Sequence, residues 1–199
     1  MPDAVWRRLQ ITPGQRELIQ GALGEMQRLE AVRRAAPNPP LIVDANEGWN
    51  FAQLIEIAPI AHDLGVVLLE QPLHADRDVE LEHYESPVTL CADESCHTRA
   101  SLDVVAARYD YVNIKLDKSG GLTEALALAR AARTMGLGVM VGCMSGTTLS
   151  IAPGYLVAQL CSYVDLDSPM YLPAEVRPEV DYHGSRIDWS THRTWGMPG

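Results

Sequence analysis

Four polar residues close short apolar runs at a nearly constant interval. Asp44, Glu70 and Asp93 each end such a run and Lys115 ends the next one, with spacings of 26, 23 and 22 residues. Carboxylates brought together repel one another unless a cation neutralises them, and oxygen ligands alone select a hard cation. The three acids therefore predict a Mg²⁺ site, with Mn²⁺ as the alternative ion. Taken singly, each acid is interpreted as a loop cap or a salt-bridge partner.

The fourth residue belongs to a rare type in this chain. Lys115 and Lys118 are its only lysines, and the other 14 of its 16 basic residues are arginines. A lysine releases its proton when a nearby cation and desolvation destabilise the ammonium, whereas a guanidinium stays protonated. Lys115 is therefore a candidate general base beside the predicted metal. A solvated surface pair of lysines is the open alternative.

These residues need a scaffold that brings strand ends together. Continuous runs of Val, Ile, Leu and Tyr are typical of strands buried on both faces of a parallel sheet. Helix-like segments separate the runs, so a βα unit repeats about every 25 residues and predicts a parallel α/β fold. The expected strands are 41–45, 66–70, 89–93, 111–115, 138–142 and 162–167, and the expected helices are 20–35, 51–65, 74–85, 97–110, 120–138 and 147–162.

Single residues punctuate these helices. Pro59 predicts a kink or an early turn within 51–65. Thr98 or Ser101 is the expected N-cap of the helix over 97–110. Gly136 is expected to close the helix over 120–138, and Pro153 with the following glycine predicts a break in the last one.

Polar residues at the C-terminal end of strand after strand favour a TIM-type barrel over an open, doubly wound sheet. An open sheet gathers its site at one switch point, often beside a Gly-rich phosphate loop. Neither G-x-G-x-x-G nor G-x-x-x-x-G-K occurs in this sequence. A closed barrel needs about 250 residues, whereas the chain has 199 and six recognisable strands. We therefore expect a partial barrel of about six βα units without its first strands.

The amino-acid composition limits the classes of partner that this protein is expected to bind. The net charge of -10 argues against nucleic acid, and no apolar stretch reaches the ~20 residues of a membrane helix. We expect no membrane partner, no secretory signal and a cytoplasmic, reducing location. No C-x-x-C spacing is present, so we expect no zinc site and interpret the thiols as small buried side chains. The cysteines are Cys91, Cys96, Cys143 and Cys161.

Six sequence strings carry a specific resemblance. IVDANEGW, LLEQPL, CADES, VNIKLDKSGGLTEA, GCMSGTT and DLDSP resemble the barrel domain of the enolase superfamily, most closely its dipeptide epimerases of the L-Ala-D/L-Glu type. The likeness covers residues 26–172. It leaves 1–25 as an atypical N-terminal segment and 173–199 as a C-terminal tail.

The resemblance implies roles for single residues. The three strand-end acids match the metal ligands, and Lys115 matches the catalytic lysine of the sixth barrel strand. Asn46 would lie just outside the direct ligands. Glu94 and Lys118 would support the site from behind, with a purely structural role as the open alternative.

The subgroup assignment depends on the last strand. Side chains two apart on a strand point the same way, so Asp165 and Asp167 can face one cationic group. In dipeptide epimerases this Asp-Leu-Asp motif is associated with the substrate α-ammonium, and a solvated pair is the alternative. A muconate-type cycloisomerase or an acyl-amino-acid racemase would not need two acids there. Cys143 and Met144 would line the pocket, although as bare residues they are interpreted as packing.

The implied reaction is a 1,1-proton transfer on a dipeptide. The metal would bind the substrate carboxylate and stabilise an ene-diolate, while two lysines serve opposite faces of the α-carbon. No lysine precedes Lys115, so the family's Lys-x-Lys motif is absent, and Arg7, Arg8 or Arg16 cannot replace it. The N-terminal capping domain is also missing.

We therefore expect a truncated chain with impaired epimerisation, derived from a gene fragment, a misassigned start or a frameshift. One alternative is a non-catalytic remnant or fragment that binds metal or forms a homo-oligomer. Another is a different racemase or cycloisomerase of the superfamily.

Overall fold

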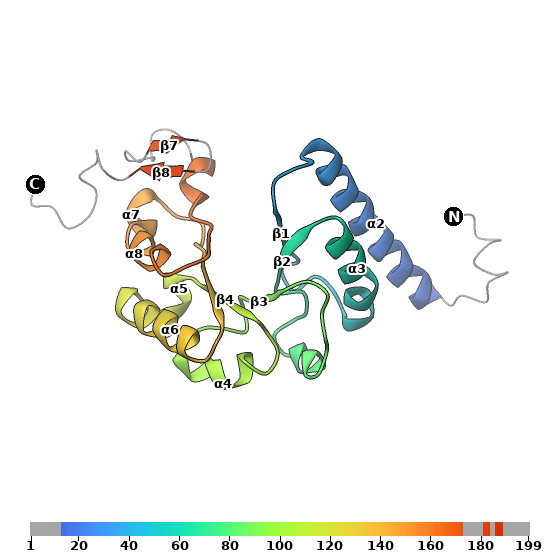
Figure 1. Cartoon of the computed structure of the whole chain (residues 1–199), viewed down its shortest axis with the longest axis horizontal. Helices are drawn as coiled ribbons and strands as arrows, with labels where there is room; N and C mark the ends of the chain where they lie inside the picture. The colour runs from blue at the N-terminus through green and yellow to red at the C-terminus, as the bar shows by residue number, and fades with distance from the viewer. Residues whose placement is uncertain (1–12, 173–180, 184–185, 189–199) are drawn as a thin grey trace, which may run out of the picture. The chain divides into compact units, whose positions relative to one another are not determined.

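The chain divides into two compact units, 1–94 and 95–199, and the computed structural model describes residues 13–172, 181–183 and 186–188 (Figure 1). The first unit alternates helices and parallel strands, as the βα period predicts. Its elements are α2 (Pro13–Ala35), β1 (Leu41–Asp44), α3 (Phe51–Asp63), β2 (Val66–Glu70), the 3-10 turn η1 (Asp78–Leu81) and β3 (Leu90–Ala92).

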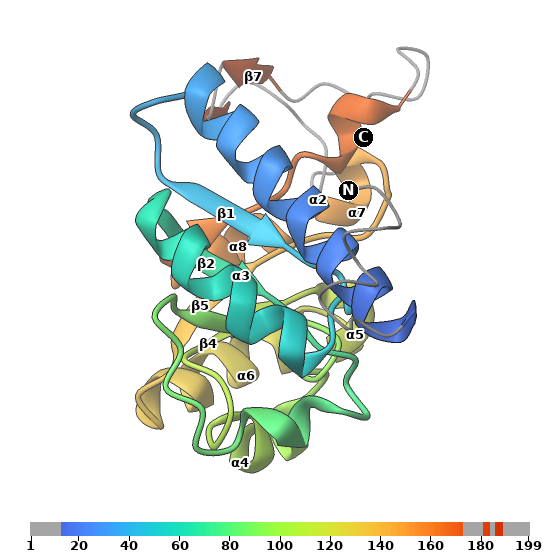
Figure 2. The ribbon, with the colours of Figure 1, turned by 90° about the vertical axis from the view of Figure 1, so that its right-hand side faces the viewer.

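The three strands of this unit are parallel and lie in the order β1-β2-β3. In the register, Asp44 is the partner of Glu70, and Glu70 is the partner of Cys91. Asp93 therefore lies two residues beyond that level, at the same end of the sheet. Figure 2 shows α2 and α3 side by side in front of β1 and β2. Leu54 and Ile57 of α3 and Leu68 and Leu69 of β2 are fully buried.

Helix α3 shows why propensity alone misleads. Asn50 caps its first turn, and Gln53 returns the bond to the Asn50 N–H in a capping box. The helix then continues through Pro59 to Asp63, so the expected early turn is wrong. Proline costs the helix a hydrogen bond, but its ring lies on the exposed side. The buried stripe that includes Leu54 holds the helix on the sheet on both sides of the proline.

The second unit contains another parallel set in the order β4-β5-β6. Ile114 is the partner of Val141, and Val141 is the partner of Val164. The residues after these strand ends therefore lie level with one another. The elements are η2 (Arg99–Ser101), α4 (Leu102–Val105), β4 (Tyr111–Ile114), α5 (Leu116–Ser119), α6 (Leu122–Thr134), β5 (Gly138–Val141), α7 (Thr148–Ile151), α8 (Gly154–Ala158), β6 (Tyr163–Val164), η3 (Ser168–Tyr171), β7 (Asp181–His183) and β8 (Arg186–Asp188).

All six predicted strands are present, but three expected elements are shorter than predicted. The helix over 97–110 is a 3-10 turn plus the single turn α4, although Thr98 caps it as expected. The acidic segment 74–85 forms only η1, because adjacent carboxylates oppose a longer helix. The strand over 162–167 ends at Val164, because Asp167 takes a helical backbone to begin η3.

The other predicted helix end and helix break are confirmed. Gly136 ends the segment after α6 with φ +86°, and Pro153 separates α7 from α8. The antiparallel pair β7 and β8 falls in the segment that the sequence left as a tail. All four cysteines are free thiols. In the ranges that the structure describes, no helix is both long and apolar enough to cross a membrane.

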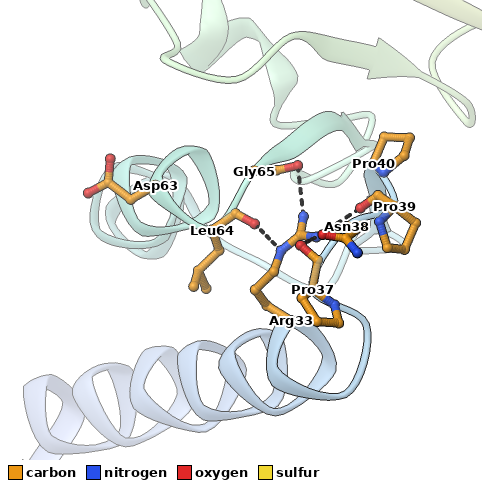
Figure 3. A pocket seen from close by; sticks show the side chains of 8 residues that line it. All are labelled: Arg33, Pro37, Asn38, Pro39, Pro40, Asp63, Leu64 and Gly65. Carbon is orange, nitrogen blue, oxygen red and sulfur yellow. Dashed lines mark hydrogen bonds between the residues drawn. The ribbon is translucent and has the colours of Figure 1, made fainter.

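Arg33 clamps the two loops that precede β1 and β2 (Figure 3). Its guanidinium donates to Leu64 O at 2.6 Å and Gly65 O at 3.2 Å, at the turn that leads into β2. It also donates to Ala36 O, Pro37 O and Pro39 O at 3.1, 3.0 and 2.8 Å. These groups border an open pocket of about 510 Å³. Because carbonyls of the chain itself engage the guanidinium, we interpret Arg33 as a structural clamp.

We predict that Arg33→Ala lowers the free energy of unfolding by about 2 kcal/mol, because five carbonyls lose a charged donor. Urea unfolding of the full chain followed by circular dichroism measures the change. The matched control is Arg34→Ala, whose guanidinium lies 3.9 Å from Glu30 at the surface and should matter by less than about 0.5 kcal/mol. Equal losses in the two variants would contradict the clamp.

Candidate active site

The three acids of the first unit lie at one end of its sheet. Asp44 and Glu70 end paired strands, and Asp93 follows β3 directly. Asp44 is exposed, whereas Glu70 and Asp93 are only 3% and 1% exposed. A buried carboxylate is costly unless donors or a cation surround it. In the structure, the three predicted acids therefore lie at the ends of adjacent strands, and two of them are buried.

Asn46 fixes the carboxylate of Asp44. Its backbone N–H donates to Asp44 Oδ1 at 2.8 Å, and its side-chain Nδ2 donates to Oδ2 at 2.7 Å. Asn46 takes φ +49°, in the left-handed region that asparagine tolerates better than most residues. This tight loop turns the Asn46 amide back onto the carboxylate, which remains able to accept at its other lone pairs.

The donor set fits a hard divalent cation. Three carboxylates end or directly follow the strands at this end of the sheet, and carboxylate oxygens are the ligands that Mg²⁺ prefers. Within the described residues, no three His, Cys, Asp or Glu side chains are gathered closely enough to hold a metal ion. The metal site therefore stays a prediction, with Asp44, Glu70 and Asp93 as the residues that would hold the ion.

Lys115 follows β4 in the second unit, and its side chain passes over Gly142. A Cβ on Gly142 would lie 3.1 Å from Lys115 Cε and 2.8 Å from both terminal atoms of the Asn113 amide. A side chain at position 142 would therefore require Asn113, and to a lesser extent Lys115, to shift. Lys115 is partly buried.

Asp165 and Asp167 lie together after β6. The Asp165 N–H donates to Val141 O at 2.8 Å, and Leu166 between the two acids is buried. Partial burial, followed by the charge of Asp167, raises the pKa of Asp165 to about 6, and the ammonium of Lys115 acts in the opposite direction. The structure thus brings Lys115, Asp165 and Asp167 into one electrostatic neighbourhood, as the sequence predicts for a cation-binding pair beside a base.

The other predicted residues occupy different settings. Cys143 lies beside Ser168, and burial raises the pKa of its thiol, so it is a neutral side chain and not an activated nucleophile. Met144 is 51% exposed. Lys118 Nζ donates to Asn113 O at 3.2 Å, which ties α5 to β4, and Glu94 is partly buried next to Asp93.

Sequence reasoning missed two residues that hold these acids. Tyr171 donates its hydroxyl to Asp167 Oδ2 at 3.2 Å, and the pKa of Tyr171 rises because the carboxylate accepts that bond. Gln71 accepts a bond from the Asp93 N–H at 2.8 Å. The sequence offered only their positions as a signal: Tyr171 lies four residues after Asp167, and Gln71 directly follows Glu70.

Comparison with known proteins shows which protein family the chain resembles. The model described as "Enolase C-terminal domain-like" matches residues 3–187. The L-Ala-D/L-Glu epimerase of Escherichia coli K12 is 47% identical over 156 residues, which cover 78% of this chain and 49% of the epimerase. An N-acetyl-D-glutamate racemase of a Pseudoalteromonas species is 45% identical over 169 residues, covering 85% and 54%. The chain thus spans about half the length of these curated relatives.

Two solved structures show the same likeness. An enolase family member from Agrobacterium tumefaciens, with bound sodium and L-Ala-L-Glu, superposes with a TM-score of 0.77 and 50% identity over 80% of this chain and 49% of that one. A dipeptide epimerase from Methylococcus capsulatus, complexed with Mg and L-Arg-D-Lys, gives a TM-score of 0.69 and 31% identity over 73% and 44%.

We predict that folding of this chain favours protonated Asp165. A pKa raised to about 6 in the folded state means that the stabilisation is complete below pH 4 and is lost as the pH rises through 6. Asp165→Asn, which mimics the protonated form, should therefore be more stable than the parent above pH 6, by about 1 kcal/mol after allowance for solvent screening. Urea unfolding at pH 4, 5, 6 and 7.5 measures this difference.

The Asp167→Asn variant provides the matched arm, because it removes the neighbouring charge and should move the titration of Asp165 towards lower pH. A parent and an Asp165→Asn variant with the same stability at every pH would contradict the electrostatic coupling of these acids.

Proposed function

Because the chain belongs to the Enolase C-terminal domain-like family, we propose that it is the part of an isomerase that moves the α-proton of a dipeptide of the L-Ala-D/L-Glu type. The observation that carries this proposal is the electrostatic grouping of Lys115, which follows β4, with Asp165 and Asp167, which follow β6, on either side of β5 in one unit. A base and a paired-acid cation receptor are the two groups that such a substrate needs.

Lys115 is the proposed base. Its stem lies against Gly142 and its amine is partly buried, and lysine, unlike arginine, can act as a neutral base. The neutral amine takes the α-proton of the substrate, and the resulting ammonium returns a proton to the same face of the α-carbon. No other lysine precedes Lys115 in this sequence, so the chain has one lysine base and would exchange the proton without inverting the centre.

Asp165 and Asp167 are the proposed receptor for the substrate ammonium. Their mutual repulsion helps to raise the pKa of Asp165, and an ammonium placed between them would relieve that repulsion. Tyr171 donates to Asp167 Oδ2 and so holds one of the two carboxylates in place. The pair therefore favours a dipeptide with a free amino terminus over an uncharged substrate.

The three acids of the first unit are the proposed Mg²⁺ ligands, with Mn²⁺ as an alternative ion. Asp44, Glu70 and Asp93 would hold the ion, and Asn46 orients the first of them. A bound divalent ion supplies stabilisation for the negative charge that grows on the substrate carboxylate as the α-proton leaves. The Mg complex of the Methylococcus capsulatus epimerase supports this assignment.

A second candidate function is racemisation of an N-acylated amino acid. The Pseudoalteromonas racemase favours it, because it matches this chain almost as well as the epimerase does. An N-acyl substrate has no ammonium, however, and would leave Asp165 and Asp167 without a cation. The paired acids therefore favour the dipeptide.

The test is solvent exchange at the substrate α-carbon. In D₂O with Mg²⁺, the full chain should exchange the glutamyl α-proton of one L-Ala-Glu diastereomer without interconverting the two. Lys115→Ala should slow this exchange at least about 100-fold, because it removes the base. Arg130→Ala, which removes an exposed cation from α6, is the matched control and should exchange like the parent. Proton NMR of both diastereomers follows the reaction.

Exchange that persists in Lys115→Ala would show that another group is the base. Interconversion of both diastereomers by the parent chain would show that a second base is present. Preference for N-acetyl-glutamate over the dipeptide would favour the second candidate function.

A further inference from the structure

Gln71 occupies a place that its sequence position does not explain. It follows the end of β2, its side chain is fully buried, and its backbone takes φ +31°, outside the region that residues with a Cβ prefer. Backbone strain of this kind persists only where surrounding contacts enforce it. The contacts around Gln71 therefore indicate what the strained residue is held for.

Those contacts reach all three strand ends of the first unit. The backbone N–H of Gln71 donates to Cys91 O at 2.9 Å, and its backbone carbonyl accepts from the Glu47 N–H at 2.8 Å. Its side-chain Oε1 accepts from the Asp93 N–H at 2.8 Å, and its Nε2 donates to Leu73 O at 2.9 Å. One residue thus ties the loop after β1, the loop after β2 and the end of β3.

We propose that Gln71 is a positioning residue that sets Asp93 relative to Glu70 for divalent-cation binding. The inference rests on the proposed metal function of these acids. Glu70 adjoins Gln71 in the chain, and Asp93 is held through its own backbone N–H. Because Oε1 fixes that N–H, the side chain of Asp93 leaves the backbone from a fixed point.

Other contacts between the loops after β1 and β2 support the same inference. Glu47 Oε1 accepts from the Ala75 N–H at 2.7 Å, and Trp49 forms a parallel bridge with Leu73. Gln71 therefore lies between loops that are already joined, and its amide is the connection from them to Asp93. Methionine at this position would fill a similar volume but would neither accept from Asp93 nor donate to Leu73.

The test compares Gln71→Met with Gln53→Met in the full chain. Gln53 also accepts a hydrogen bond, from the Asn50 N–H at 3.0 Å, but it caps α3. Calorimetric titration with Mg²⁺ should show about 10- to 100-fold weaker binding in Gln71→Met, with parent-like affinity in Gln53→Met. Amide exchange followed by NMR should show faster exchange of the Asp93 N–H in Gln71→Met alone.

Parent-like Mg²⁺ affinity in a folded Gln71→Met chain would overturn the inference while leaving the metal function intact. A parent chain that binds no Mg²⁺ would instead overturn the metal function, and the role of Gln71 with it. If Gln71→Met does not fold, Gln71→Glu is the second variant, since its carboxylate keeps an acceptor for the Asp93 N–H. We then expect Mg²⁺ affinity within a few-fold of the parent and a protected Asp93 N–H, and an affinity more than about 10-fold weaker with that N–H still protected would overturn the inference. Unprotected exchange of the Asp93 N–H in the folded parent would also overturn the inference.

Discussion

The site depends on the register of parallel strands. Parallel pairing places residue after residue of neighbouring strands at one level, so Asp44 is level with Glu70 in the first unit. In the second unit, Ile114, Val141 and Val164 are level, so Lys115, Gly142 and Asp165 follow at the next position. A shift of one residue in any strand would send its polar group to the opposite face. The buried apolar residues of the strands thus determine where the chemistry lies.

This register of strands brings negatively charged carboxylates near one another in each unit. Glu70 and Asp93 are buried in the first unit, and Asp165 and Asp167 repel each other in the second, so a cation would lower the electrostatic free energy of either set. The raised pKa of Asp165 reflects its partial burial and this repulsion. Asn46, Gln71 and Tyr171 hold carboxylates or their backbone in place. Side chains or backbone groups that are already held by hydrogen bonds have less conformational freedom to lose when a cation binds.

The fold class was predictable because the strand pattern is strong. Continuous apolar runs and a regular βα period predicted a parallel α/β chain, and the family match and structural neighbours confirm a partial barrel of the enolase superfamily. Lengths were less predictable, since tertiary packing decides them. Burial carries α3 through Pro59, whereas Asp167 ends the last strand early to begin a 3-10 turn.

The sequence pattern singled out the candidate acids and the candidate base, which stay predictions as site residues, but not the residues that support them. Acids at strand ends stand out in a sequence, because strand ends converge in any parallel sheet. Gln71 and Tyr171 could not be recognised in the same way, because their roles depend on hydrogen bonds to Asp93 and Asp167 across a turn. The sequence alone does not distinguish a buried glutamine from an exposed one. Likewise, the glycine that makes room for Lys115 is recognisable only once Asn113 is seen against it.

We propose that strand register builds one cation site from three acids. The decisive experiment is a crystal structure of the chain grown with Mn²⁺, in which anomalous scattering locates the ion. We expect a single ion that receives at least one oxygen from each of Asp44, Glu70 and Asp93. An ion bound by other residues, or by only one of these acids, would refute this proposal.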